Sequence, residues 1–285
     1  MKGLGFLLAA ACIASHAALA ETRMTDDAGR TVVLQQPASR IVSLAPHVTE
    51  LLFAAGAGER IVGAVQYSDY PPAALDIPRI GDSAQLDLER IVSLKPDLVI
   101  AWRHGNSQGQ VETLLRIGIP VFYNEPHGLA DVARSIEQFG RLAGTRDVAG
   151  AAAGDFAARN AALRAAYAGR ASVSVFFQIW ERPLMTVNGE HLISDVISLC
   201  GGRNVFANLK SLVPVVSAED VLAADPEAIV GSERKPDWSR WPRLSAVAHG
   251  NVFVLPSELI DRPTPRILQG AQQLCEDLQS ARARQ

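Results

Sequence analysis

The residues best equipped for chemistry follow a short apolar segment. Residues 98–101 (Leu-Val-Ile-Ala) predict a buried strand, and Trp102, Arg103, His104 and Gly105 come directly after it. A strand needs only a turn at its end, whereas an indole face, a guanidinium and an imidazole are groups that hold ligands. We therefore expect Trp102 to form the wall of a binding cleft, with Arg103 and His104 on its rim.

Further aromatic residues occur where strands are expected to end, so that the set comprises Tyr67, Tyr70, Trp102, Tyr123 and Trp180. In parallel α/β sheets, ligands bind beyond the carboxyl ends of the strands. Several aromatic faces at that edge suit a large, flat, partly apolar ligand. Core packing is the alternative for any single ring, but the repetition favours a ligand site.

Motifs of common enzymes are missing. The sequence contains no GxxxxGK[ST], HExxH, CxxC or GxSxG pattern, so we expect neither an enzyme nor a catalytic cofactor. A catalytic triad assembled from distant residues leaves a secreted hydrolase as an alternative. Scattered histidines leave a zinc or manganese site across two lobes as another. These histidines are His47, His104, His127, His191 and His249.

Length and composition indicate a globular protein with more than one lobe. The chain has 285 residues, of which 48% are hydrophobic and 20% charged, and this length suggests two lobes. A formal net charge of -3 and the lack of a basic run give no reason to expect a nucleic-acid partner.

The first twenty residues are typical of a secretory signal peptide. A positive start is followed by the apolar run 4–14, and Ala18-Leu19-Ala20 forms an A-x-A cleavage site. A buried N-terminal helix is the alternative. Cys12 raises the possibility of a lipoprotein, but Ala9 stands where a lipobox has leucine. We expect cleavage after Ala20 and a soluble protein outside the cytoplasm.

Two cysteines remain after such cleavage, Cys200 and Cys275. Two cysteines in an oxidising compartment favour a disulfide over two buried free thiols.

Short apolar strands alternate with helices along most of the chain. This alternation predicts α/β lobes with parallel sheets. Residues 145–169 are rich in alanine and lack proline, which predicts one long helix. Strands are expected at 40–44, 61–65, 98–101, 120–123, 173–178, 228–230 and 252–255, and helices at 49–56, 88–94, 111–117, 131–143, 192–199, 218–224 and 265–281.

Four segments carry a family resemblance: residues 67–72 (YSDYPP), 88–103 (LERIVSLKPDLVIAWR), 200–206 (CGGRNVF) and 265–275 (PRIL with AQQLC). With them the chain resembles the periplasmic cobalamin-binding members of the helical-backbone (class III) substrate-binding protein family. The likeness covers nearly everything after Arg40. It implies a monomer that captures cobalamin or a related corrinoid between two lobes and delivers it to an ABC importer, a permease dimer with its ATPase. Haem or an iron-siderophore is the alternative ligand within the same fold.

The resemblance also implies the division of the chain. It gives a signal peptide at 1–20, an N-terminal α/β lobe at 21–143, a linking backbone helix at 144–170 and a C-terminal α/β lobe at 171–285.

Site residues follow from the resemblance position by position. Tyr67 matches a ligand-contacting tyrosine, Trp102 lies in the matching AWR segment, and the second-lobe contact segment corresponds to Glu258, Leu259, Ile260, Asp261 and Arg262. Trp180 and His47 are further expected ligand contacts. Exposed carboxylates Glu89 and Glu219, one per lobe, match the residues that dock on the permease; a solvated helix face is the alternative. Cys200 and Cys275 match the family's disulfide.

Several positions depart from the family pattern. Ser83 and Val213 stand where cleft tryptophans are expected, and Leu259-Ile260 replaces an aromatic pair. His47 and His104 occupy positions of small residues, so either imidazole is a candidate axial ligand of cobalt. The resemblance therefore implies the family scaffold with a partly altered cleft.

Overall fold

The computed structural model describes residues 21–284. The predicted signal peptide, including Cys12, lies outside the described residues. Between residues 21 and 284 no helix is long and apolar enough to cross a membrane.

The N-terminal lobe is built on a four-stranded parallel sheet. Its strand order is β4-β3-β5-β6, with β3 at Ile41–Ser43, β4 at Ile61–Ala64, β5 at Leu98–Trp102 and β6 at Val121–Asn124. The helices are α1 (Pro46–Ala54), α2 (Leu88–Ser93), α3 (Gln108–Arg116) and α4 (Leu129–Ala143), with 3-10 turns at Gly58–Arg60 and Pro72–Asp76. A separate antiparallel hairpin, β1 (Thr22–Thr25) and β2 (Thr31–Leu34), precedes the sheet.

The C-terminal lobe repeats this design with a second parallel sheet of order β10-β9-β7-β8. Its strands are β7 (Val173–Gln178), β8 (Gly202–Asn204), β9 (Ala228–Ser232) and β10 (Val252–Leu255). Its helices are α6 (Leu192–Leu199), α7 (Ala218–Ala224), α8 (Ser245–Ala248), α9 (Ser257–Ile260) and α10 (Ile267–Ala283). Two parallel sheets flanked by helices confirm the predicted fold class.

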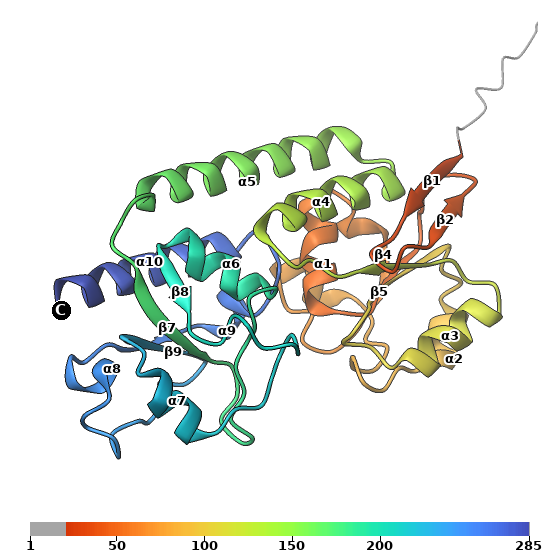
Figure 1. Cartoon of the computed structure of the whole chain (residues 1–285). Helices are drawn as coiled ribbons and strands as arrows, with labels where there is room; N and C mark the ends of the chain where they lie inside the picture. Colours follow the sequence, from red (N-terminus) through yellow and green to blue (C-terminus); the bar gives the residue numbers. More distant parts are fainter. Residues whose placement is uncertain (1–20, 285) are drawn as a thin grey trace, which may run out of the picture.

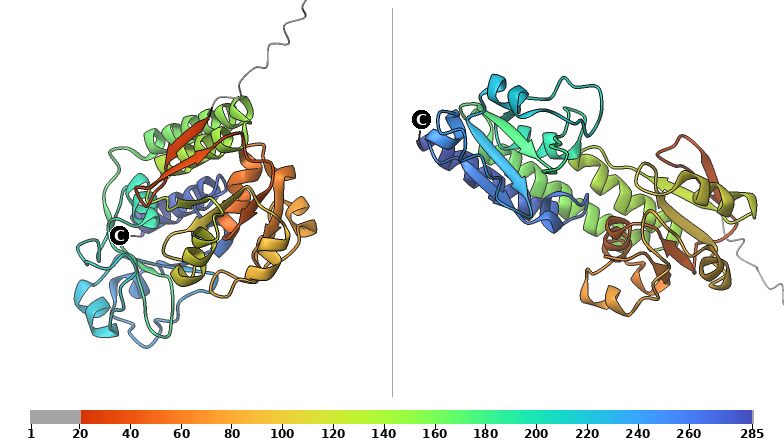
Figure 2. Two further views of the ribbon diagram at one scale, coloured as in Figure 1. Left: turned by 90° about the vertical axis from the view of Figure 1, so that its right-hand side faces the viewer. Right: turned by 90° about the horizontal axis from the view of Figure 1, so that it is seen from below.

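One long helix, α5 (Arg146–Tyr167), runs along both lobes (Figures 1 and 2). At about 1.5 Å per residue, its 22 residues extend about 33 Å. Ala149, Ala153 and Phe156 form its buried stripe, at the spacing of one helical face. The helix therefore packs along one side only, and its other face is exposed. The expectation of one long helix here is confirmed.

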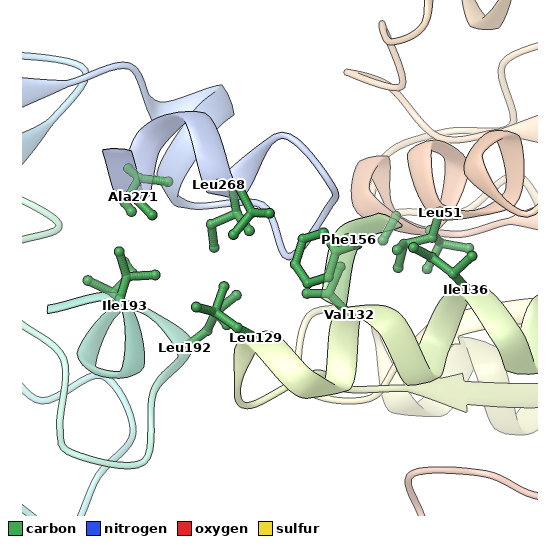
Figure 3. Close-up of a cluster of buried hydrophobic side chains, with 14 of the residues drawn as sticks. Leu51, Leu129, Val132, Ile136, Phe156, Leu192, Ile193, Leu268 and Ala271 are labelled. Carbon is green, nitrogen blue, oxygen red and sulfur yellow. The ribbon is translucent and has the colours of Figure 1, made fainter. Parts of the chain in front are cut away.

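The lobes share a continuous apolar core beneath α5 (Figure 3). Leu129 at the start of α4 lies beside Leu192 at the start of α6, with Leu268 of α10 next to them. Asp195 of α6 adds polar contacts, because its carboxylate accepts the backbone N–H of Leu129 at 2.9 Å and an Arg164 N–H at 2.9 Å. Separation of the lobes would expose this core, so the structure resists wide opening.

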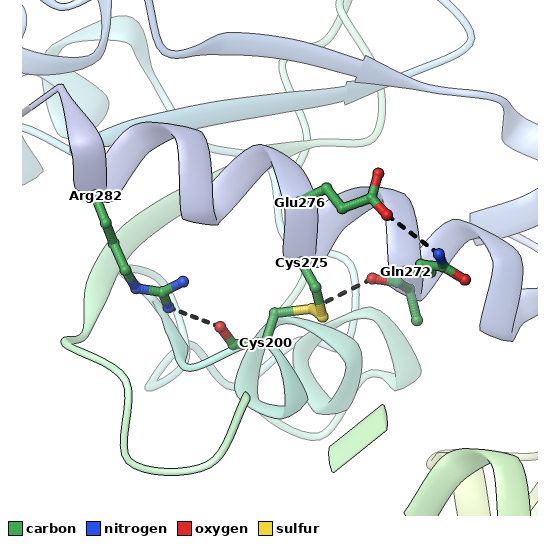
Figure 4. The surroundings of a disulfide bond; sticks show 6 residues. Cys200, Gln272, Cys275, Glu276 and Arg282 are labelled. Atoms are coloured by element: carbon green, nitrogen blue, oxygen red, sulfur yellow. Dashed lines mark hydrogen bonds between the residues drawn. A yellow bond between two sulfur atoms is a disulfide. The ribbon is translucent and has the colours of Figure 1, made fainter. Parts of the chain in front are cut away.

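A disulfide joins Cys200, at the end of α6, to Cys275 in α10 (Figure 4). Arg282 of the same helix donates to the Cys200 carbonyl oxygen at 2.7 Å. The predicted disulfide is thus present, and it ties together two helices that are far apart in sequence.

The elements that sequence patterning missed are short. The β1–β2 hairpin turns through Gly29 (φ 75°), and β8 consists of Gly202-Arg203-Asn204 without a large apolar side chain. The strand β8 therefore depends on pairing with β7 rather than on a run of strand-forming residues.

Candidate ligand-binding cleft

A cavity of about 550 Å³ lies between the lobes, at the carboxyl ends of the first-lobe strands. Its first-lobe wall includes Pro46, His47, Trp102, His104, Glu125, Pro126 and His127. Its second-lobe wall includes His191, Leu192, Ser211, Leu212, Val213, Ile260, Asp261, Arg262 and Pro263. The volume lies within the range of ligand pockets, and both lobes contribute.

Asn106 fixes the loop that carries Trp102. Its side-chain oxygen accepts the Trp102 backbone N–H at 2.7 Å, and its amide nitrogen donates to the carbonyl oxygens of Leu44 at 2.8 Å and Ser83 at 3.1 Å. A Cβ on Gly105 would meet the Trp102 ring at 1.8 Å, so only glycine lets the indole lie across this turn. The indole is therefore set in place before any ligand binds.

Glu125 joins the ends of β5 and β6. Its carboxylate accepts the Trp102 indole N–H at 3.2 Å and the His104 backbone N–H at 3.0 Å, and it lies 3.1 Å from the His104 Nδ1 atom. The Glu125 side chain is only 8% exposed, and its backbone N–H donates to Asp27 at 2.7 Å. One buried carboxylate thus orients both an aromatic ring and an imidazole at the cavity.

His47 lies in the wall behind Trp102. The two rings meet edge to face, with centroids 5.5 Å apart. Burial, followed by the nearby positive charge of Arg262, lowers the pKa of His47 to about 3, although Asn124 acts in the opposite direction. His47 is therefore a neutral ring at physiological pH.

The second-lobe wall is more apolar. Leu212, Val213 and Ile260 face the cavity together with His191 at the start of α6. The His191 Nδ1 atom accepts the backbone N–H of Ile193 at 3.1 Å, which caps the helix. Burial, with the nearby His127, lowers the pKa of His191 to about 4, so this ring is also neutral.

Asp261 and Arg262 supply the charges of this wall. Asp261 is exposed as a residue, yet its carboxyl group is crowded, and the lost hydration raises its pKa to about 6. Arg262 donates to Asp69 at 2.7 Å and to Glu50 at 3.0 Å, both in the first lobe. The arginine therefore reaches across the cleft.

Glu50 is the centre of this contact between the lobes. It is 4% exposed, and it accepts two further bonds from Arg266, at 2.9 Å and 2.7 Å. The Arg266 guanidinium also lies 4.0 Å from the centroid of the Tyr70 ring. We call Glu50, Asp69, Arg262 and Arg266 the inter-lobe clasp. Together with α5, it connects the lobes at a second place.

Some predicted contacts lie away from the cavity. Tyr67 is 75% exposed with φ 63°, and Trp180 is 59% exposed with its indole N–H bonded to the Arg182 carbonyl at 3.0 Å. Glu258 borders a different depression, and Leu259 packs against Gly270 of α10. The cavity walls thus hold Trp102, His47, Ile260, Asp261 and Arg262 of the predicted set, but not these four.

Two other expected rim groups point elsewhere. Arg103 donates to the Asp27 carbonyl oxygen at 3.1 Å, on the hairpin side of the lobe. Tyr123 stacks with Arg30, whose guanidinium is 4.3 Å from the ring centroid. The row of aromatics at the strand ends is therefore reduced to Trp102 at the cavity.

The two proposed docking carboxylates occupy equivalent positions. Glu89 is the second residue of α2 and Glu219 the second residue of α7, and both are exposed. Asp87 caps α2 by accepting the Arg90 N–H at 2.9 Å, and Ser217 caps α7 by accepting the Asp220 N–H at 3.1 Å. Each lobe thus has an exposed glutamate in the first turn of a helix, Glu89 in α2 and Glu219 in α7.

Residues that sequence reasoning missed include Glu125, His191 and Glu50. Glu125 directly follows the apolar strand β6, which is the position that singled out Trp102. Glu50 stands within an apolar helix, and a buried charge there implies a partner. Nothing local to His191 indicated that it would face a cleft.

Comparisons with known proteins agree with this architecture. Residues 41–259 match the family described as periplasmic binding protein. The vitamin B12-binding protein of Vibrio cholerae serotype O1 is 39% identical over 250 residues, covering 86% of this chain and 91% of that protein. The crystal structure of the periplasmic vitamin B12 binding protein BtuF of Vibrio cholerae superposes with a TM-score of 0.81 at 39% identity, covering 86% of this chain and 98% of that one.

More distant structures share the fold alone. The periplasmic heme binding protein HutB of Vibrio cholerae is 21% identical, with a TM-score of 0.72 and coverage of 84% of this chain and 98% of that one. From the family match, the identity and the superposition together, the chain belongs to the periplasmic binding protein family.

Proposed function

We propose that this protein captures cobalamin or a related corrinoid in the cleft and delivers it to an ABC importer. The observation that carries the proposal is the cavity between the lobes, with the fixed face of Trp102 on one side and Leu212, Val213 and Ile260 on the other. A flat macrocycle buries apolar area against both walls. The similarity of this chain to vitamin B12-binding proteins supports the same ligand class.

The polar groups of the cleft suit the edge of such a ligand. Cobalamin carries amide side chains around its rim, and these groups both donate and accept hydrogen bonds. Arg262 offers donors, while Asp261 offers a carboxylate that accepts when ionised. The charged residues therefore contribute orientation, and the apolar walls contribute most of the binding free energy.

Delivery is assigned to Glu89 and Glu219. Exposed carboxylates at equivalent helix starts, one per lobe, can pair with arginines of two permease subunits at the same time. The double variant Glu89→Ala with Glu219→Ala should keep its corrinoid affinity and lose uptake by cells. A matched control is Glu59→Ala with Glu276→Ala, one exposed carboxylate from each lobe. Intact uptake with the first pair removed would refute the docking role.

We also propose that the protein acts in the periplasm. Residues 1–20 would direct secretion and be removed, leaving a periplasmic monomer with lobes at 21–143 and 171–285 and a linking segment at 144–170. The protein would bind and release its ligand without changing it, as a binding protein rather than an enzyme.

Absorption spectroscopy for the two coloured ligands, together with calorimetry for zinc, which has no visible absorption, tests the ligand class. The purified protein is titrated separately with cyanocobalamin, haemin and zinc chloride. We expect saturable binding of the corrinoid at one equivalent, competed by unlabelled cobalamin in a dialysis assay. Saturable binding of haemin with none of cyanocobalamin would overturn the corrinoid assignment in favour of haem, and tight binding of zinc alone would assign a metal-ion transporter.

A further inference from the structure

Histidine is concentrated in the cleft. Four of the five histidines in residues 21–284 line the single cavity described above: His47, His104, His127 and His191. Imidazole is a metal ligand whose two ring nitrogens differ in role according to the hydrogen bonds they make. The hydrogen bonds of each ring therefore decide which of them can present a free lone pair to a ligand.

Two of the four rings are poorly suited to that task. Because His191 Nδ1 accepts a backbone N–H, the neutral ring carries its proton on Nε2 and presents a donor. His47 is only 4% exposed, and its Nε2 atom is enclosed without a hydrogen-bond partner. It belongs to the wall rather than to the open surface of the cleft.

The ring of His127 is accessible to a ligand, but no hydrogen bond fixes its orientation. The residue is exposed, and its backbone N–H donates to Asp131 at 2.9 Å. Its ring makes no hydrogen bond to any of residues 21–284 that would fix its orientation. Immobilising it on a ligand would therefore cost side-chain entropy.

His104 combines access with orientation. Its side chain is 63% exposed, and Nδ1 lies 3.1 Å from the buried Glu125 carboxylate. The same carboxylate accepts the His104 backbone N–H and the Trp102 indole N–H, so two N–H donors hold it in place. A ring that carries its proton on Nδ1, facing Glu125, keeps the lone pair of Nε2 free. A carboxylate behind an imidazole is the arrangement that orients metal-binding histidines and raises their basicity.

A single imidazole suits a metal that a macrocycle already holds. Within residues 21–284, no group of three or more His, Cys, Asp or Glu side chains is arranged to hold a free ion. The cobalt of a corrinoid has its four equatorial positions filled by the ring, so one protein nitrogen is enough at an axial position. We propose that His104 Nε2 coordinates the cobalt of a corrinoid whose upper axial ligand is an exchangeable water; this rests on the proposed function.

The step is a ligand exchange. The cobalt–oxygen bond to water breaks, the water leaves with its own electron pair, and the Nε2 lone pair of neutral His104 forms the new cobalt–nitrogen bond. Neither a proton nor an electron is transferred. Glu125 acts as a positioning residue, because it holds the Nδ1 proton and thereby the ring orientation.

The test compares two corrinoids that differ only at the upper axial position. Aquocobalamin has a replaceable water there, whereas cyanocobalamin holds a cyanide that imidazole does not displace. The wild-type protein should shift the visible bands of aquocobalamin towards those of its imidazole complex, and it should leave those of cyanocobalamin near their free positions. In His104→Gln we expect the aquocobalamin shift to vanish and its affinity to fall at least about tenfold. Cyanocobalamin affinity should fall less than aquocobalamin affinity, because His104 loses only wall contact with the first and both wall contact and an axial bond with the second.

The control is His127→Gln, an identical replacement in the same cavity, which should preserve the shift. Retention of the shift and of aquocobalamin affinity in His104→Gln would overturn the assignment. Binding of both corrinoids by the wild type without a shift would also overturn it, while leaving the proposed function standing. Binding of neither corrinoid would instead remove the proposed function.

Discussion

The two walls of the cleft are built differently. On the first lobe, Trp102 and His104 are fixed by hydrogen bonds to a buried carboxylate, Glu125. On the second lobe, Leu212 and Val213 present apolar surface without side-chain polar groups. The first wall can thus orient an aromatic face towards a ligand, while Leu212 and Val213 of the second wall add contact area with little angular preference.

The inter-lobe clasp also takes different groups from the two lobes. The first lobe supplies the buried acceptor Glu50, and the second supplies the donors Arg262 and Arg266. On the side away from the cleft, the second lobe is held by a disulfide, whereas the first lobe has no cysteine. Changes to the second lobe should therefore act on stability, and changes to the first-lobe wall on recognition.

The largest expected effect comes from the disulfide. Replacing Cys200 and Cys275 together by alanine removes a cross-link between residues 75 positions apart. The chain-entropy account predicts a loss of about 4 kcal/mol in the free energy of unfolding. Urea denaturation under oxidising conditions measures it. Under reducing conditions the wild type should approach the variant, and equal stability under oxidising conditions would contradict the role given to this bond.

The inter-lobe clasp should come next. Glu50→Ala leaves Arg262 and Arg266 without their buried acceptor, and removal of one partner of a buried ion pair costs roughly 3 kcal/mol. The matched change Asp69→Ala removes a half-exposed partner of Arg262 and should cost less than about 1 kcal/mol. Thermal or urea unfolding compares the two. Similar losses for both would mean that burial of Glu50 is not decisive.

The affinity for a corrinoid should depend more on the first-lobe wall of the cleft than on the second-lobe wall. Trp102→Ala should weaken cyanocobalamin binding by roughly 2 kcal/mol, because it removes a large oriented aromatic face. Leu212→Ala should cost about 1 kcal/mol, since the remaining apolar wall compensates in part. Calorimetry on both variants gives the ratio. A larger loss at Leu212 would reverse the division of roles between the lobes.

Acid should destabilise the protein through the buried histidines. The pKa of His47 is about 3 in the folded chain and 6.5 when unperturbed. The unfolded chain therefore binds a proton below about pH 6.5 that the folded chain does not, so stability is present above that pH and is lost as pH falls. The slope is up to about 1.4 kcal/mol per pH unit.

Histidine variants separate the acid destabilisation caused by His47 from the contribution of Asp261. The raised pKa of Asp261 acts in the opposite direction, because it favours the folded state as pH falls. His47→Gln should lose its share of the slope between pH 6.5 and 5, and so should His191→Gln, whose pKa is lowered to about 4. Unfolding curves at several pH values provide the measurement. Parallel pH profiles for wild type and both variants would show that neither ring is held neutral by folding.

The smallest effect is expected at Tyr67. This side chain is 75% exposed outside the cavity, so a role in binding requires it to meet the ligand from the rim. The contact implied by the family resemblance predicts that Tyr67→Ala lowers corrinoid affinity by about 0.5 kcal/mol. Unchanged affinity would remove Tyr67 from the site and would confine recognition to the walls.

Prediction from sequence succeeded where the pattern is local. The apolar run that became β5 and the alanine-rich segment that became α5 carry their own periodicity and length. The position of Trp102 followed from β5, because the end of a parallel strand lies at the carboxyl edge of the sheet, where ligands bind. By contrast, β8 has only three residues, and its conformation depends on pairing with β7.

The contacts that sequence could not provide join distant residues. Glu50 and Arg262 are 212 positions apart, and no spacing rule relates them. The bonds from Glu125 to Trp102 and His104 also require the β5–β6 register to be known. Sequence thus located groups at the edge of each sheet, but only the assembled lobes show which of these groups meet.

The most direct test of the corrinoid-binding cleft is calorimetric titration of residues 21–285 with cyanocobalamin. We expect one molecule to bind per chain, at submicromolar affinity, with a negative heat-capacity change from the burial of apolar area. Absence of any heat of binding at several temperatures, for a protein shown to be folded, would contradict the central claim that this cleft holds a corrinoid.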